Sequence, residues 1–388
     1  MVTLTDYFNP ISIEKPTFEH LSGPAQFSHN IAAHTDNMTL NDISKYRIAI
    51  IGVPEGRNAV NTGTEKSPDA VREKLYNLSK IPGKPKIIDL GNMKQGVTFN
   101  DTLAGLTDVL IMLIDMNVFP VIIGGSSALI PSIDRCFSFK KQPYTMVSVD
   151  SRIDFNSEKK EIDSLNYLYN IVYNHKSSIT HFINIGYQTY LNDYQVINRF
   201  LKKQYDLLRI GDVRQAINFT EPLFRDSDVS IFDISAVRQS DAPGTSNPSP
   251  NGFYGEEICL LARYAGISDQ LKVFGLFDVN PDFDIRSQTS GLAAQIIWFF
   301  LEGFSQKQSE TQSLNDYNSG HFKRYHVRIT DLDDDLIFVK SNFTDRWWIE
   351  IHNSNNINNY VACSYEDYLK ANHNEVPDRW VKAVARLK

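Results

Sequence analysis

The chain has 388 residues, of which 42% are hydrophobic and 22% are charged. This globular composition excludes a collagen, a coiled coil and a wholly disordered chain, and the net charge of −7 does not favour a nucleic-acid binder. No apolar run reaches the roughly 18 residues of a membrane span. The N-terminus lacks the basic start and apolar core of a signal peptide, and three scattered cysteines suit a reducing compartment, so we expect a cytoplasmic protein.

The main body of the chain alternates short apolar runs with helix-like stretches. The predicted strands are 46–53, 119–125, 144–149, 182–185, 229–232 and 271–277. The predicted helices are 67–78, 103–116, 165–173, 193–202, 255–265 and 291–304. Near-continuous apolar runs are typical of strands that are buried on both faces. Their alternation with helices predicts an α/β fold with a mostly parallel sheet and helices on both of its faces.

Three other regions flank this α/β domain, which we place at residues 46–304. Residues 1–45 are rich in turn-forming residues and are interpreted as an N-terminal extension. Residues 305–320 are polar and predict a linker. Residues 321–388 predict a small C-terminal α+β appendage with a hairpin, a third strand at 347–351 and one or two final helices. We expect any protein partner to bind through this appendage.

Polar side chains follow four of the predicted strands, at the edge of a parallel sheet where ligands bind. They lie in the segments 124–127, 150–154, 233–235 and 278–281. Among them are four carboxylates, those of Asp150, Asp154, Asp233 and Asp278. Carboxylates gathered at one edge repel one another unless a cation, a proton or hydrogen-bond donors offset their charge. This edge is therefore the predicted functional site.

These segments resemble the ureohydrolase family, which includes arginase, agmatinase and formimidoylglutamase. The matching segments are Gly52-Val53-Pro54, Gly124-Gly125, Asp150-Ser151-Arg152-Ile153-Asp154, Phe232-Asp233-Ile234-Ser235, Ala242-Pro243-Gly244-Thr245-Ser246-Asn247-Pro248 and Asp278-Val279-Asn280-Pro281. The resemblance covers roughly residues 46 to 304 and implies a three-layer arginase-like fold and a homo-oligomer. It also implies two manganese ions, which lower the pKa of water so that a hydroxide attacks a guanidinium or formimino carbon.

The chain departs from the family at the positions that carry this chemistry. The substituted motif positions are Ser126, Ser127, Arg152 and Ser235. By the resemblance, Ser127 and Arg152 stand where the family has its two metal-ligand histidines, and Ser235 stands in place of a metal-ligand aspartate. Asp278 replaces the substrate-contacting glutamate. No histidine stands near residues 166–167, where the family carries its proton-shuttle histidine.

Arg152 is the most informative of these substitutions, because a guanidinium stays protonated and cannot bind a metal. We expect Arg152 to pair with Asp150 and Asp233, and to exclude a second metal ion unless its side chain turns away. Asp150, Asp154 and Asp233 then remain as ligands for one divalent cation, Mn²⁺, Mg²⁺ or Ca²⁺, or for none. This weighs against a binuclear manganese site.

Two functions are consistent with this pattern. The loss of both metal-ligand histidines and of the shuttle histidine favours a catalytically inactive protein with a binding, scaffold or regulatory role. The alternative is an active hydrolase of a linear C–N bond, in formiminoglutamate or a guanidino compound, that uses one divalent metal. We expect Asp278 and Asn280 to line the ligand pocket in either case. No catalytic residue is expected in the inactive protein, and Asp278 is the catalytic residue if the protein is active.

Overall fold

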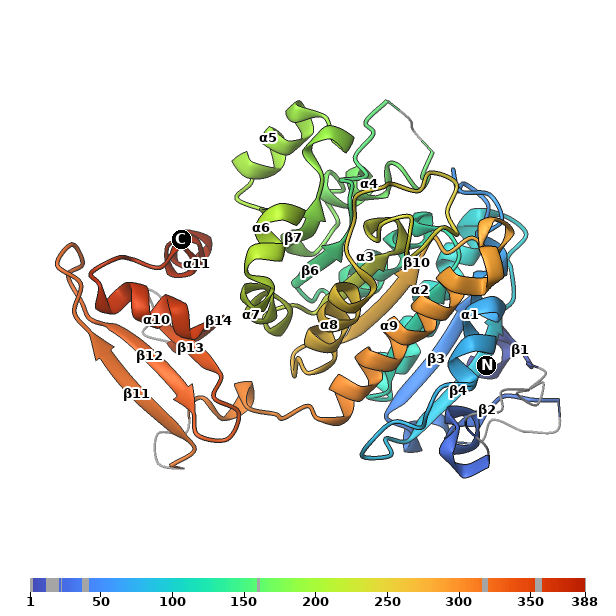
Figure 1. Ribbon diagram of the computed structural model, residues 1–388, viewed down its shortest axis with the longest axis horizontal. Helices are drawn as coiled ribbons and strands as arrows, with labels where there is room; N and C mark the ends of the chain where they lie inside the picture. Colours follow the sequence, from blue (N-terminus) through green and yellow to red (C-terminus); the bar gives the residue numbers. More distant parts are fainter. Residues whose placement is uncertain are drawn as a thin grey trace.

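The computed structural model describes residues 3–11, 21, 23–36, 42–158, 161–315, 320–352 and 358–387. An α/β body is followed by a smaller sheet with two helices, which lies to one side of the body (Figure 1). No helix of the described residues is both long and apolar enough to cross a membrane.

A ten-stranded sheet forms the centre of the body within the described ranges, in the order β1-β4-β3-β5-β10-β9-β6-β7-β8, with β2 beside β4. The strands are β1 Phe8–Asn9, β2 Ala32–Ala33, β3 Ile48–Val53, β4 Ile87–Met93, β5 Phe119–Gly124, β6 Tyr144–Val149, β7 Ile179–Tyr187, β8 Asp206–Arg209, β9 Val229–Asp233 and β10 Val273–Phe277. The pairs are parallel except for β1 with β4.

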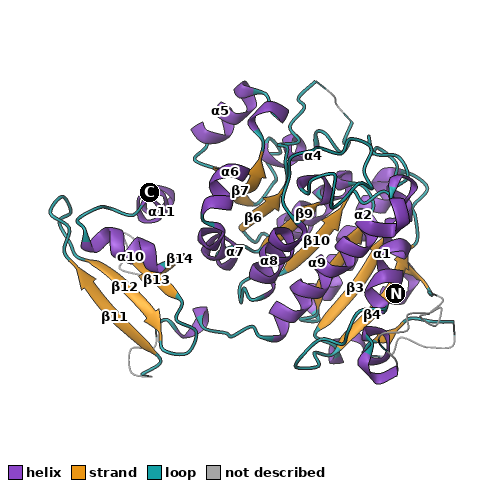
Figure 2. Ribbon diagram, in the orientation of Figure 1, coloured by secondary structure: helices purple, strands orange, loops and turns teal. Residues whose placement is uncertain are grey.

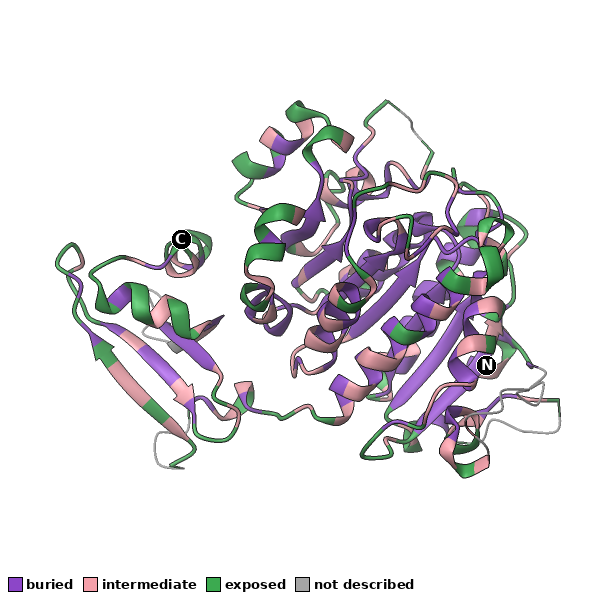
Figure 3. Cartoon of the chain, in the orientation of Figure 1, coloured by how far each residue is buried: buried purple, intermediate pink, exposed green. Residues whose placement is uncertain are grey.

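Helices cover both faces of this sheet (Figure 2). They are α1 Ser67–Tyr76, α2 Phe99–Asp115, α3 Pro131–Phe139, α4 Tyr167–Val172, α5 Tyr194–Lys202, α6 Ile210–Gln215, α7 Glu221–Arg225, α8 Gly255–Gly266 and α9 Gln288–Ser305. Side chains of α1 and α6–α9 belong to the same hydrophobic cluster as Ile48 and Ile50 of β3, and those of α2–α5 belong to the cluster that contains Ala49 and Ile51. Successive strand residues thus serve opposite cores, and the central strands β3, β5, β9 and β10 are buried from both sides (Figure 3). The predicted three-layer α/β architecture is confirmed.

The structure also contains elements that the apolar pattern does not reveal. Strand β4 was missed because a charged residue, Asp89, interrupts its apolar run. Asp89 is fully buried, where the Arg72 Nε and the Tyr76 hydroxyl each donate to its Oδ2 at 2.8 Å. Strands β1 and β2 pair with β4, so the segment expected as an extension adds to this edge of the sheet. Strand β8 and helices α3, α6 and α7 were missed as well.

The C-terminal appendage is an antiparallel sheet in the order β11-β12-β13-β14, followed by two helices. Its elements are β11 Phe322–Val327, β12 Leu336–Ser341, β13 Trp347–His352, β14 Asn358–Cys363, α10 Tyr365–Asn372 and α11 Asp378–Leu387. The predicted hairpin, third strand and final helices are present. Strand β14 was not predicted, since it starts with asparagines that are typical of a loop.

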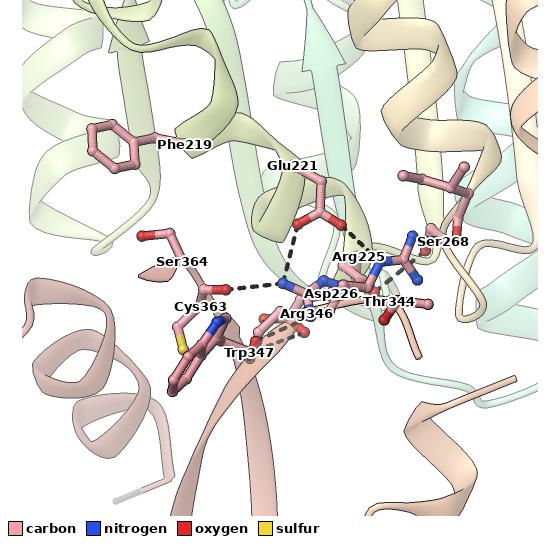
Figure 4. A network of polar contacts seen from close by, with 12 residues as sticks. Phe219, Glu221, Arg225, Asp226, Ser268, Thr344, Arg346, Trp347, Cys363 and Ser364 are labelled. Atoms are coloured by element: carbon pink, nitrogen blue, oxygen red, sulfur yellow. Dashed lines mark hydrogen bonds and ion pairs between the residues drawn. The ribbon is translucent and has the colours of Figure 1, made fainter. Parts of the chain in front are cut away.

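A buried arginine at the end of α7 joins the appendage to the body (Figure 4). The Arg225 side chain is 2% exposed. It donates to the carbonyl oxygens of Trp347 and Cys363, both at 3.0 Å, and to Glu221 Oε2 at 3.1 Å. Its guanidinium also lies 4.6 Å from the centre of the Trp348 ring. Hydrogen bonds from Arg225 in the body to backbone carbonyl groups of the appendage therefore hold the two parts together.

Candidate functional site

The site is built at the carboxyl ends of four adjacent strands, β5, β10, β9 and β6. Gly125 follows β5, Asp278 follows β10, Asp233 is the last residue of β9, and Asp150 follows β6. Neighbouring strands in a sheet lie about 4.8 Å apart. The strand order therefore brings together four segments that are distant in the sequence. This agrees with the prediction that the polar segments after these strands meet at the carboxyl edge of the sheet.

Three of the predicted carboxylates form one cluster. Ligand oxygens of Asp150, Asp154 and Asp233 all lie within 4.8 Å of one another. The three residues are 1%, 8% and 7% exposed. Backbone N–H groups satisfy part of the cluster: that of Arg152 donates to Asp150 Oδ1 at 2.9 Å, and that of Ser235 donates to Asp233 Oδ1 at 2.7 Å. Asp150 Oδ2 is buried, and no hydrogen-bond donor from the described part of the chain meets it.

Burial and mutual repulsion make full ionisation of this cluster unfavourable. Burial, and then the negative charge of Asp233, raise the pKa of Asp150 well above its ordinary value. The same two causes, in the same order, raise the pKa of Asp154 to about 8 and that of Asp278 well above its usual range. In the protein without a cation, protons therefore occupy part of the site at neutral pH.

Asp278 is held beside the cluster in a strained backbone conformation. Its φ of 66° lies in the left-handed region, which a non-glycine residue adopts only where its surroundings impose it. Its N–H donates to Gly125 O at 2.9 Å, and its Oδ2 accepts from the Ser127 N–H at 3.1 Å. Its Oδ1 is buried, and no donor of the described residues meets it. This oxygen lies beside the Asp233 carboxyl group and lines the cavity where a ligand would bind.

Asn280, predicted to line the ligand pocket, has a structural role instead. Its Nδ2 donates to Asn61 Oδ1 and Thr62 O, both at 2.7 Å, and its Oδ1 accepts from the Asp282 N–H at 3.0 Å. Asn61 was missed by the sequence analysis because no motif marks it. Its Nδ2 donates to Asp278 O at 2.8 Å and its Oδ1 accepts from the Ser246 N–H at 3.0 Å. Asn61 thus ties three loops of the site together.

The expected ion pairs of Arg152 with Asp150 and Asp233 are not formed. Within the described residues, the Arg152 guanidinium makes neither a hydrogen bond nor an ion pair, although its charge lowers the pKa of Asp150 and Asp154. Only its backbone N–H contacts the cluster, at Asp150 Oδ1, and its side chain lines both of the cavities beside the carboxylates. Arg152 therefore leaves the carboxylates without a paired cation.

Two cavities meet at this point. The smaller, of about 40 Å³, is lined by Ser127, Asp154, Asp233, Ser235 and Asp278 among others. The larger, of about 470 Å³, lies against α5. Arg152, Asp154 and Leu165 line both. A water molecule needs roughly 10–15 Å³ of such a cavity. The smaller cavity therefore has room for a cation with a few waters, and the larger cavity has room for an organic ligand.

No histidine of the described residues lines the smaller cavity. His181 lies at the opposite end of the sheet, where its Nε2 is 2.9 Å from Asp206 Oδ2, and His175 lines a separate cavity. The start of α4, where the family carries a shuttle histidine, holds Tyr167 instead. Tyr167 is buried, and burial followed by the charges of Asp154 and Asp150 raises its pKa well above the ordinary value. The sequence analysis did not single it out as a neighbour of the cluster.

The residues present fit one divalent cation. Buried carboxylates with an unpartnered oxygen need a compensating charge, and three oxygen donors within this distance suit a hard ion such as Mn²⁺, Mg²⁺ or Ca²⁺. Asp150, Asp154 and Asp233 would hold it. The lack of imidazole donors leaves the described residues without the mixed ligand set that the resemblance implies for two manganese ions.

Gly125 sets the distance between the loops that follow β5 and β3. A Cβ added to it would lie 2.3 Å from the carbonyl oxygen of Glu55, a backbone atom that cannot move easily. We expect Gly125→Ala to lower the free energy of unfolding by about 1–3 kcal/mol, measured by urea denaturation. Gly291→Ala is the control: it meets open space in α9, so it should raise stability by up to about 1 kcal/mol. Equal effects of both would contradict this role of Gly125.

Comparisons with known proteins agree with this architecture. A family model described as the arginase family matches residues 46–302. Formimidoylglutamase of Staphylococcus haemolyticus is 22% identical over 295 residues, covering 72% of this chain and 94% of its own. The structure of formimidoylglutamase from Bacillus subtilis superimposes with a TM-score of 0.67 at 20% identity, covering 76% of this chain and 97% of its own. Trypanosoma cruzi formiminoglutamase, solved with Mn²⁺, gives a TM-score of 0.66 at 18% identity, covering 74% of this chain and 100% of its own. These structural likenesses establish the fold.

Proposed function

Because the chain belongs to the arginase family, we propose that it hydrolyses a C–N bond of a linear formimino or guanidino compound with the help of one divalent cation. The observation that carries this proposal is the buried cluster of Asp150, Asp154 and Asp233, which opens onto a cavity and includes an unpartnered oxygen. The relatives named formimidoylglutamase support the class of bond.

Each residue of the cluster has a distinct part in this proposal. Asp150, Asp154 and Asp233 hold the cation, which when bound makes a nucleophile available at neutral pH by lowering the pKa of water. Asp278 Oδ1 accepts a hydrogen bond from a substrate N–H, or gives a proton to the leaving nitrogen, because no donor of a described residue meets it. Its strained backbone keeps the carboxyl group aimed at the cavity.

A second candidate is a family member that binds a ligand without hydrolysing it. One observation favours it: no histidine of the described residues reaches the cavity, so proton transfer has no imidazole to serve it. The comparisons lend more support to the hydrolase, because the named relatives that match most of this chain are enzymes.

One experiment separates the two candidates. We expect protein equilibrated with Mn²⁺ and freed of excess ion to contain about one ion per chain by elemental mass spectrometry. It should release product from formiminoglutamate, arginine or agmatine, lose this activity in EDTA and regain it with the ion. Turnover only after the triple change Ser127→His, Arg152→His and Ser235→Asp would instead identify the natural chain as an inactive binding protein.

A further inference from the structure

We propose that a separate cavity, between the body and the appendage, binds a free apolar α-amino acid through both of its charged groups. This cavity has a volume of about 190 Å³. It lies near the amino ends of β6, β7 and β8, at the opposite edge of the sheet from the carboxylate cluster. Binding there does not depend on the proposed hydrolysis.

The walls of this boundary cavity come from both parts of the molecule. The three strands, α7 and the turn before it form the wall on the body side, and β14 and α11 close the cavity from the appendage side. The apolar side chains of the walls are those of Ile183, Leu208, Phe219, Leu223 and Val361. One water needs roughly 10–15 Å³, so the cavity has room for about a dozen heavy atoms. That is enough for a free amino acid and too few for a nucleotide.

Three polar side chains of the boundary cavity satisfy one another. His181 Nε2 lies 2.9 Å from Asp206 Oδ2, and the Lys382 ammonium group donates to Asp206 Oδ1. Burial lowers the pKa of His181, so its ring is neutral at pH 7. The charges of Asp206 and Lys382 therefore cancel, and these three groups hold α11 against the start of β8 without offering a net charge to a ligand.

Two opposite charges on the same walls, those of Asp226 and Arg386, form no ion pair with a described residue. Asp226 accepts from the Ala362 N–H alone, at 3.2 Å to Oδ1 and 3.0 Å to Oδ2. The Arg386 Nε donates to the Lys382 carbonyl oxygen at 3.1 Å. Burial raises the pKa of Asp226 to about 6, and the charges of nearby arginines, Arg386 among them, oppose this rise. The two groups therefore lie near each other on the walls of one cavity without touching.

The two remaining charged side chains of the cavity leave this pair unchanged. One Nη of Arg379 donates to Phe219 O at 2.7 Å, and its Nε lies 3.7 Å from Asp367 Oδ2. Asp378 is exposed in the first turn of α11, where a negative charge is favourable at the helix N-terminus. Asp226 and Arg386 are thus the groups that a ligand can bridge.

An amino-acid zwitterion matches this arrangement. Its ammonium group meets the Asp226 carboxylate, which is ionised above about pH 6. Its carboxylate meets the guanidinium of Arg386, whose planar fork can donate two parallel hydrogen bonds. Because both groups of an α-amino acid are attached to one carbon atom, one small molecule spans two side chains that do not touch. The apolar walls favour an apolar side chain on that carbon.

Calorimetric titration of the full-length protein at pH 7.5 tests this with L-leucine and two analogues that each keep one charge. 4-Methylpentanoate lacks the ammonium group, and 3-methylbutylamine lacks the carboxylate. The wild type should bind leucine about 10- to 100-fold more tightly than either analogue. Arg386→Gln should weaken leucine and 4-methylpentanoate about 10-fold and leave the amine unchanged. Asp226→Asn should weaken leucine and the amine and leave 4-methylpentanoate unchanged, since the amide oxygen still accepts from the Ala362 N–H.

Arg328→Gln and Asp335→Asn are the matched controls, since they remove the same charges from an ion pair of 3.5 Å that does not line the cavity. Both should keep the wild-type affinities. The inference is overturned if leucine does not bind, if an analogue binds as tightly as leucine, or if Arg386→Gln and Asp226→Asn bind leucine as the wild type does. Leucine binding that is lost in Asp233→Asn would place the ligand at the carboxylate cluster and would also overturn it.

Discussion

Asp233→Asn is expected to reverse the effect of divalent cations on stability. The negative charge of Asp233 raises the pKa of Asp150, Asp154 and Asp278, so Asp233 repels each of the other three carboxylates. Removing that charge should make the metal-free variant more stable than metal-free wild type at pH 8. With Mn²⁺ present the order should invert, because only the wild type keeps all three carboxylate ligands. At a free ion concentration about 100 times Kd, the wild type gains about 2.7 kcal/mol.

The pH dependence follows from the same groups. In metal-free protein, the pKa of Asp154 rises from 3.8 to about 8, so the folded state holds a proton that the unfolded state has lost across this window. Stability without the cation therefore falls as pH rises between these values, by up to about 1.4 kcal/mol per pH unit for each such proton. The cation displaces the protons, so its stabilisation should grow from pH 5 to pH 8.

Thermal unfolding in EDTA and in MnCl₂, at pH 5 and pH 8, measures both effects. Asp115→Asn serves as control, because Asp115 is exposed and pairs with Lys140 away from the site. This variant should follow the wild type in all four conditions. A wild-type response to Mn²⁺ that Asp233→Asn retains in full would show that the cluster is not the cation site.

Arg225→Met is expected to lower the free energy of unfolding by about 3–5 kcal/mol, the usual effect of removing one partner from a buried charged network. The substitution leaves the carbonyl oxygens of Trp347 and Cys363 without their shared donor. It also leaves Glu221 with a single cation, Arg346, at 3.4 Å. These groups lie between the body and the appendage, so the lost stability should weaken the attachment of the appendage to the body (Figure 4).

Tryptophan fluorescence during urea unfolding reports this effect, since Trp347, Trp348 and Trp380 are three of the four tryptophans and all lie in the appendage. Arg225→Lys should recover only part of the stability, because one ammonium cannot reach both carbonyl oxygens with the geometry of the fork. Arg328→Met removes an exposed ion pair with Asp335 and should change stability by less than about 1 kcal/mol. Equal midpoints for Arg225→Met and Arg328→Met would contradict the role assigned to Arg225.

Regular elements were predictable where the local pattern and the tertiary environment agree. Residues 144–149 were predicted as a strand and form β6 with the same bounds, because most of the run is apolar or β-branched. Strand β4 escaped prediction because Asp89 is tolerated in the core only through Arg72 and Tyr76, which come from α1. A buried ion pair has no local signature, since neither partner reveals the other in the sequence.

The sequence by itself determined the α/β class, the edge of the sheet that carries the site, and the four carboxylates there, because the periodicity of apolar residues and the polar residues after each strand are local properties. Only the tertiary structure decided how those side chains are used. It placed β10 and β9 between β5 and β6, joined the loops through Asn61, and left the Arg152 guanidinium beside the carboxylates without an ion pair to a described residue. These outcomes depend on strand order and on competition for hydrogen-bond acceptors, which are set by contacts between residues far apart in the chain.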